Sequence, residues 1–265
     1  MSTPLIALTD IQKSFGAVTA LRGVTIDIDP GETLALLGDN AAGKSTLMKV
    51  LTGVYQPDAG TISYAGDTVV FENPSVSRAH GIEMIFQDFA LADNLDVRSN
   101  IFLGREVKRN LLGGLIRILN NKEMTARTRT VLDSLDIEID PRLKVRRLSG
   151  GQRQAVAIGR ALAFEAKLVI MDEPTANLSV AKVEKLIEVT KRLKELGIAV
   201  IIITHRMDEA FAVADRIVVM RQGSVVGRFR PTEANETDIA HLISHGELPP
   251  SHAHHQPETK GARLS

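Results

Sequence analysis

The residues with the clearest chemistry lie in one loop, which reads GDNAAGKST from Gly38 to Thr46. Gly38 and Gly43 frame four residues, and Lys44 and Ser45 follow at once, which is the spacing of a phosphate-binding loop. The glycines let the backbone turn tightly, so that successive N–H groups point inward toward phosphate oxygens. We therefore expect a nucleotide to contact Gly38, Asp39, Asn40, Ala41, Ala42, Gly43, Lys44, Ser45 and Thr46.

Two side chains of this loop have roles of their own. Lys44 carries the charge expected on the β- and γ-phosphates, and Ser45 offers a hydroxyl to Mg²⁺. The apolar run Leu34–Leu37 precedes the loop, and an apolar stripe at helical spacing follows it from Leu47. A chance strand-to-helix turn lacks this context, and a dinucleotide fold would have glycine in place of Asn40.

Polar side chains follow three further apolar runs. Asp172 and Glu173 come directly after one run, and Gln87 and His205 follow two others. Because the carboxyl ends of parallel strands meet at one edge of a sheet, we expect these side chains to lie near the phosphate loop. Taken singly, each has a plainer explanation: an acid pair after a strand also fits a loop or a helix cap, and a lone histidine is usually structural.

Strand and helix patterns alternate along most of the chain, which predicts a largely parallel central sheet. Short alternating segments between Leu5 and Phe71 predict an antiparallel layer beside it. We thus expect an α/β fold: a P-loop NTPase core with a mostly parallel sheet, an antiparallel β subdomain and an inserted α-helical subdomain near residues 88–160. The expected strands of the central sheet are Leu34–Leu37, Gly81–Phe86, Leu168–Met171 and Ile198–Ile203.

Residues 95–148 are mostly helical in pattern, and glycines and Pro141 interrupt the helical segments. Within them, Leu111–Leu119 is apolar and flanked by basic residues. We interpret this segment as the core of a helix, and a surface that faces a partner is the alternative.

The chain divides into an expected ATP-binding domain at residues 1–247 and a tail at residues 248–265. The tail is rich in proline, histidine and polar residues without apolar periodicity, so we expect it to be disordered. Its His252, His254 and His255 also fit weak metal binding, but no defined ligand geometry accompanies them.

Composition narrows the function classes. The chain has 265 residues, 44% of them hydrophobic and 24% charged, with a formal net charge of zero. This balance argues against a nucleic-acid binder that relies on a broad basic surface. Cysteine is absent, which removes disulfides and thiol chemistry. We expect neither a signal peptide nor a membrane span, because the N-terminal residues lack a basic region and no apolar run is long enough.

A second specific motif, LSGGQ at Leu148–Gln152, lies between the phosphate loop and the stretch LVIMDEP. On its own, Ser149 is a natural N-cap for a helix that runs to about Phe164. In this order, however, the motifs resemble those of the nucleotide-binding subunit of ATP-binding cassette (ABC) transporters. The resemblance covers about residues 5–245.

The resemblance implies a role for each polar residue at the strand ends. Asp172 would hold Mg²⁺ beside Ser45, and Glu173 would be the general base for the attacking water. Gln87 would be a Mg²⁺ or water ligand that also senses a membrane partner, and His205 would contact the γ-phosphate of ATP.

The resemblance also implies contacts to adenine and between subunits. Phe15 would stack on adenine, with a place in the core as the alternative. Ser149, Gly150 and Gly151 would contact the γ-phosphate bound by the other subunit, Ser149 through its hydroxyl and Gly151 through its N–H. Since the sequence has one phosphate loop and one LSGGQ, the working unit would be a homodimer, or a pair with a homologous ATPase, bridged by ATP.

Two positions depart from the family pattern. Ala41 stands where glycine is frequent, although Gly38 and Gly43 remain. The segment 176–179 reads Ala-Asn-Leu-Ser, where many members have Ser-Ala-Leu-Asp, so Ser179 puts the usual contact of this loop across the dimer in doubt.

Four longer sequence segments are similar to those of the ATPases of bacterial monosaccharide importers, which often carry two tandem cassettes. This similarity implies an integral membrane permease as partner and, indirectly, a periplasmic or extracellular sugar-binding protein, but no nucleic acid. The subunit would be peripheral, on the cytoplasmic face of the inner membrane. The segments are GDNAAGKSTLMK at 38–49, GIEMIFQD at 81–88, NIFLGRE at 100–106 and LSGGQRQAVAIGRA at 148–161.

Three other functions share parts of this pattern. A soluble ABC protein acting on DNA, ribosomes or cluster assembly has the same phosphate motifs, but tends to carry tandem cassettes, coiled-coil inserts or basic arms. A regulatory nucleotide module would not need Glu173 and His205. A P-loop kinase fits the phosphate loop but fits LSGGQ poorly.

Overall fold

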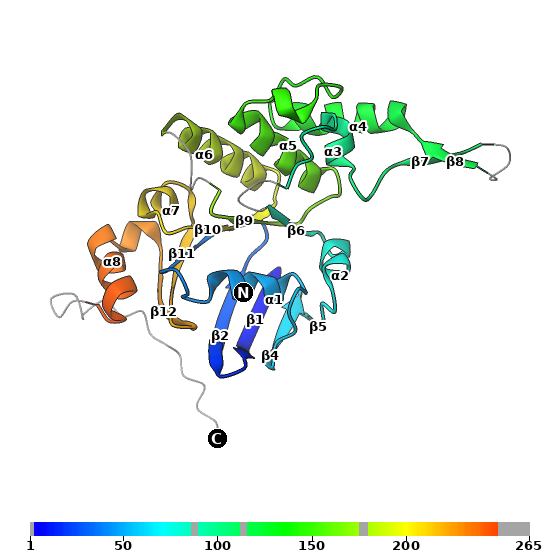
Figure 1. The fold of residues 1–265 in the computed structure, drawn as a ribbon. Helices are drawn as coiled ribbons and strands as arrows, with labels where there is room; N and C mark the ends of the chain where they lie inside the picture. Colours follow the sequence, from blue (N-terminus) through cyan, green and yellow to red (C-terminus); the bar gives the residue numbers. More distant parts are fainter. Residues whose placement is uncertain (1–2, 86–89, 112–115, 175–179, 249–265) are drawn as a thin grey trace.

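The computed structural model describes residues 3–85, 90–111, 116–174 and 180–248. Their centre is a six-stranded sheet in the order β12-β11-β3-β10-β9-β6, which crosses the middle of Figure 1. The sheet is parallel except for the edge strand β12, which forms a hairpin with β11. Its strands are β3 Thr33–Leu37, β6 Ile82–Ile85, β9 Leu168–Asp172, β10 Ala199–Ile203, β11 Arg216–Arg221 and β12 Ser224–Phe229.

A separate antiparallel sheet, in the order β2-β1-β4-β5, forms the predicted second layer. Strands β4 and β5 form a hairpin in this sheet, and its turn lies at Ala65–Gly66. The first two strands are longer than the alternating segments suggest, because Ile6 pairs with Ile28 and the ladder continues to Phe15 and Val18. The strands are β1 Ile6–Phe15, β2 Val18–Ile28, β4 Ala59–Tyr64 and β5 Asp67–Val69.

Alternate residues of the central strands belong to two different cores. Leu168 and Ile170 of β9 pack with helix α1 and the antiparallel sheet. Val169 and Met171 of the same strand pack with helices α5 and α6. This alternation is why the central runs are apolar at every position. The helices around the sheet are α1 Lys44–Leu51, α5 Gly150–Leu162, α6 Val180–Glu195, α7 Met207–Val213 and α8 Glu236–His245.

The helical subdomain forms a third core between α3, α4 and α5, which contains Val97, Leu132 and Val156. Asp96 and Asn120 cap α3 and α4 by accepting backbone N–H groups with their side chains. No helix in the described ranges is long and apolar enough to cross a membrane. The remaining helices are α2 Pro74–Ala79, α3 Val97–Ile101, α4 Asn121–Ser134, and the short 3₁₀ segments η2 Val145–Arg147 and η3 Pro231–Glu233.

The helix predicted at Leu111–Leu119 is wrong. The chain instead forms an antiparallel hairpin of β7 Lys108–Leu111 and β8 Ile116–Leu119, which projects from the helical subdomain in Figure 1. A short apolar run fits a strand or a helix equally well, so its periodicity does not decide between them. β-Branched Ile116 and Ile118 favour the strand.

Candidate nucleotide-binding site

Glycine is required at both ends of the phosphate loop. Gly38 follows β3 with φ +152°, and a Cβ there would lie 2.2 Å from the carbonyl oxygen of Met220. Gly43 has φ +99°, and a Cβ there would lie 2.8 Å from the carbonyl oxygen of Ala20. Strands β11 and β2 therefore approach the loop so closely that any side chain at these positions would displace backbone.

Ala41 stands where the family pattern frequently has glycine, and its backbone conformation is one that glycine favours. Its φ is +68°, in the left-handed region. A non-glycine residue there costs about 1–2 kcal/mol, whereas glycine adopts this conformation freely. The loop keeps its shape with alanine at this position, but at a cost in strain.

Lys44 is the first residue of α1 and is 6% exposed. Its Nζ donates to the carbonyl oxygens of Gly38 at 2.6 Å and Asp39 at 2.9 Å. Burial lowers the pKa of the Lys44 ammonium, while the negative charges of Glu173 and Asp172 act in the opposite direction. The ammonium and the N-terminus of α1 give the loop a positive centre that suits phosphate.

The structure brings together the two described residues predicted to hold metal. The side chain of Ser45, in the first turn of α1, interacts with the carboxylate of Asp172 at the end of β9. Burial raises the pKa of Asp172, and the adjacent charge of Glu173 raises it further, against the effects of Lys44 and Ser45. A hydroxyl and a carboxylate are ligands that Mg²⁺ accepts when phosphates and water complete its shell, so this donor set fits the ion.

Glu173 and His205 come from neighbouring strands. The backbone N–H of Glu173 donates to the carbonyl oxygen of Ile203 at 2.9 Å, which ties the ends of β9 and β10 together. Glu173 Oε1 lies 3.3 Å from His205 Nδ1, and the two side chains are 25% and 55% exposed. A carboxylate that is open to solvent and oriented by an imidazole is suited to accept a proton from water.

Phe15 is 43% exposed, which rules out the alternative that it belongs to the core. Its ring meets that of Tyr55 edge-on, with the centroids 5.0 Å apart, and Lys13 Nζ lies 5.7 Å from its centroid. Tyr55 was not predicted, and its signal in the sequence is an aromatic residue shortly after the helix that follows the loop. An exposed phenylalanine ring, supported by the half-buried ring of Tyr55, offers apolar surface to a planar base.

The LSGGQ segment forms the N-terminus of α5. Ser149 Oγ accepts from the backbone N–H of Gln152 at 3.3 Å, and Gln152 Oε1 accepts from that of Ser149 at 3.0 Å. A Cβ at Gly151 would meet nothing within 4 Å, so this face is open. Helices α5 and α1 pack on opposite faces of the central sheet. Within the described residues of one chain, no hydrogen bond joins Ser149, Gly150 or Gly151 to the phosphate loop.

Two predicted positions lie outside the described residues. In the sequence, Gln87 comes shortly after strand β6, which ends at Ile85 and pairs with β9. Ser179 comes after Glu173. The predicted tail from residue 249 onward also lies outside them.

Comparison with known proteins agrees with this geometry. Residues 21–176, more than half of the chain, match the family described as "ABC transporter". The chain is 46% identical over 241 residues to the xylose/arabinose import ATP-binding protein XylG of Sulfolobus acidocaldarius, covering 91% of this chain and 94% of that protein. It is 43% identical to the ribose import ATP-binding protein RbsA of Geobacillus kaustophilus, covering 90% of this chain but 48%, about half, of that relative.

A solved structure agrees as well. It is the dimeric structure of the ATP-binding cassette MJ0796 in a post-hydrolysis state bound to ADP and Pi, which matches with a TM-score of 0.69 and 26% sequence identity. The match covers 85% of this chain and 98% of that one. The α/β fold with its antiparallel β subdomain is therefore that of ABC ATPases. The chain belongs to the ABC transporter family, as an ATP-binding transport ATPase of that family.

Proposed function

We propose that this chain is the ATP-hydrolysing subunit of an importer that takes up a monosaccharide through a separate membrane permease. The observation that carries the proposal is the length of its similarity to the xylose/arabinose import protein, which spans nearly all of both chains. The ribose import relatives support the same substrate class through a match to about half of their length.

Within one subunit, the phosphate loop and Lys44 bind the triphosphate, and the exposed ring of Phe15 supports adenine. Ser45 and Asp172 are the residues that would hold Mg²⁺, which neutralises phosphate charge when bound. Glu173 accepts the proton of the attacking water, and His205 orients that carboxylate from 3.3 Å. Gln87, which follows β6 in the sequence, would be a water or metal ligand.

The hydrolytic unit we propose is a dimer with two shared sites. The open N-terminus of α5 supports this arrangement, because no hydrogen bond in the described part of one chain joins Ser149, Gly150 or Gly151 to the phosphate loop, and α5 and α1 pack on opposite faces of the sheet. The dimeric form of the similar solved cassette points the same way. Ser149→Arg should keep ATP affinity in the isolated subunit and abolish hydrolysis; an equal loss of affinity in this variant would contradict the shared site.

The permease and its extracellular sugar-binding protein remain the proposed partners, with the subunit held at the cytoplasmic face of the membrane. The test is uptake of labelled monosaccharides by cells that lack the gene. Accumulation of one sugar should be lost while its later metabolism continues, and the wild-type gene should restore uptake whereas Glu173→Gln should not. Normal uptake of every sugar, together with lost transport of an amino acid, metal or lipid, would refute the sugar assignment and leave the ATPase intact.

A further inference from the structure

The β7–β8 hairpin has no role in the nucleotide site, yet it projects from the molecule between α3 and α4 (Figure 1). Its ladder pairs Lys108 with Leu119, Arg109 with Ile118 and Asn110 with Arg117. An isolated two-stranded hairpin is only marginally stable in water. A projecting hairpin of this kind gains most from a surface that covers it.

Apolar and cationic side chains are exposed together on the hairpin. Ile116 and Leu119 are each 47% exposed, among the most exposed large apolar residues that the structure describes. Lys108, Arg109 and Arg117 are also exposed. Directly opposite residues share a face of the ladder, so Lys108 and Leu119 lie on one face and Arg109 and Ile118 on the other. Each face therefore combines a cation with an apolar side chain.

The charge of this segment has one sign. Between Glu106 and Glu123 the sequence contains Lys108, Arg109, Arg117 and Lys122, and no acidic residue. The whole chain has a net charge of zero, so this is a local concentration of positive charge rather than a property of the protein as a whole.

We propose that the β7–β8 hairpin binds the surface of an anionic lipid membrane. The hairpin would lie within the headgroup region with lipid on both of its faces. Lys108, Arg109 and Arg117 would then contact lipid phosphates, while Leu119 on one face and Ile116 on the other enter the interface between headgroups and acyl chains. Basic residues and apolar side chains together are the combination that holds peripheral proteins on anionic membranes, where neither suffices alone. The inference rests on the proposed function in one respect, since an importer subunit works beside a membrane.

The positive charge of the hairpin also argues against two other binding partners, a second copy of the hairpin and a loop of a permease. A second copy of the hairpin would bring like charges together, because no acidic residue on β7 or β8 pairs with the cations. Cytoplasmic loops of membrane proteins carry an excess of lysine and arginine, so a permease loop is a poor electrostatic match. An anionic lipid surface complements both the charge and the apolar side chains.

The test is sedimentation of the whole chain with vesicles, without a permease. The protein should bind vesicles of phosphatidylglycerol and phosphatidylcholine, and bind vesicles of phosphatidylcholine alone much more weakly. Arg109→Gln/Arg117→Gln should reduce the partition coefficient about 25-fold, because each cation near an anionic surface contributes roughly five-fold. Leu119→Gln should reduce it about five-fold. Raising the salt concentration should weaken binding of wild type more than binding of the double arginine variant.

Matched controls use exposed residues elsewhere. Arg129→Gln/Arg142→Gln removes as many cations from the same subdomain, and Leu196→Gln removes an apolar side chain of similar exposure. Both should bind the vesicles like wild type. ATP affinity should be unchanged in every variant, which confirms that each is folded.

Three results would overturn the proposal: no binding of wild type to anionic vesicles, equal binding by wild type and the hairpin variants, or equal losses in the control variants. If the hairpin variants bind vesicles normally but no longer co-purify with a permease, the hairpin contacts protein instead of lipid. These measurements use neither ATP hydrolysis nor sugar uptake, so their failure is separate from a failure of the transport assignment.

Discussion

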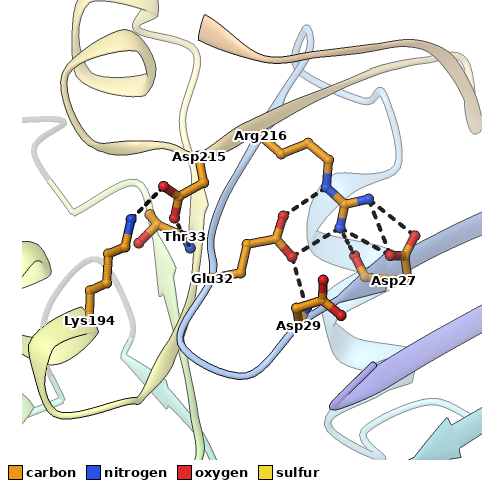
Figure 2. A network of polar contacts seen from close by, with 7 residues as sticks. All are labelled: Asp27, Asp29, Glu32, Thr33, Lys194, Asp215 and Arg216. Carbon is orange, nitrogen blue, oxygen red and sulfur yellow. Dashed lines mark hydrogen bonds and ion pairs between the residues drawn. The ribbon is translucent and has the colours of Figure 1, made fainter. Parts of the chain in front are cut away.

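Charged side chains lie at both ends of the central sheet, but their pairing is closer at the amino ends of the strands than at the carboxyl ends. At the amino ends of β3 and β11, Arg216 and Lys194 are closely paired with carboxylates (Figure 2). Arg216 donates to both carboxylate oxygens of Glu32, at 2.8 and 3.0 Å, and to the backbone carbonyl oxygen of Asp27 at 2.6 Å. Asp215 accepts from the backbone N–H of Thr33 at 2.9 Å and pairs with Lys194.

At the carboxyl ends, the acids are held much more loosely. Glu173 has a contact of 3.3 Å to His205, and its backbone has a positive φ of +47°. Asp172 lies beside a like charge, which together with burial raises its pKa. At the other end, bonds to Glu32 and Asp27 outweigh burial and raise the pKa of Arg216, which stabilises its charge.

The difference indicates that one end of the sheet stabilises the fold and the other carries the chemistry. Fully paired charges are already satisfied and have little to offer a ligand. Loosely held carboxylates cost stability but remain available to a metal, a phosphate or a water. Substitutions of the same type at the two ends should therefore separate activity from stability.

The largest contrast is expected between Glu173→Gln and Glu32→Gln. Removing the proposed general base should lower the rate of phosphate release about 10²–10⁴-fold while ATP still binds. The same carboxylate-to-amide change at Glu32 should leave turnover near wild type and lower Tm instead. Near-normal turnover of Glu173→Gln would assign the base to another residue.

Lys44→Ala should have the next largest effect. The loop keeps its amides but loses a charge-assisted bond to phosphate, which corresponds to roughly 10–150-fold weaker ATP binding in a calorimetric titration. Lys194→Ala, which removes an ammonium from the amino end, is the control and should bind ATP like wild type. Equal affinity in the two variants would place the phosphate site elsewhere.

These contrasts also show what the sequence could reveal. Strands β3, β6, β9 and β10 of the central sheet were predicted within one residue, because segments such as Leu168–Met171 and Ile198–Ile203 are buried on both faces and read as continuous apolar runs. The contact of Ser45 with Asp172 was predictable too, since each belongs to a motif at the end of a parallel strand.

Long-range pairing could not be predicted in the same way. Arg216 and Asp27 are 189 positions apart, and nothing local marks either residue as the other's partner. The backbone of Ala41 and Glu173, with positive φ, depends on how the neighbouring strands hold them. The β7–β8 hairpin was missed because its short apolar run has no decisive period and no core to fix its register.

Arg216→Met should mainly affect stability. It leaves Glu32 and Asp27 without their cation, which costs about 1–3 kcal/mol, because the pair is only partly buried. A protein of this size should then unfold roughly 2–10 °C earlier. Turnover measured well below that temperature should remain near wild type, and a large loss of turnover there would mean that the two ends are coupled.

The smallest effect is expected from Asp172→Asn, measured as the Tm of the nucleotide-free protein. The pKa of Asp172 is raised in the fold above its ordinary value, so the ionised carboxylate destabilises the folded state. This cost is absent below about pH 4, where both states are protonated, and grows as the pH rises through the folded pKa. Asn cannot ionise, so the variant should gain Tm relative to wild type as the pH rises, until the difference becomes constant. The same variant should hydrolyse ATP poorly, because it removes a ligand proposed for Mg²⁺. A Tm difference that is independent of pH would show that burial and Glu173 do not destabilise this carboxylate, and that the carboxyl end of the sheet is no less stable than the amino end.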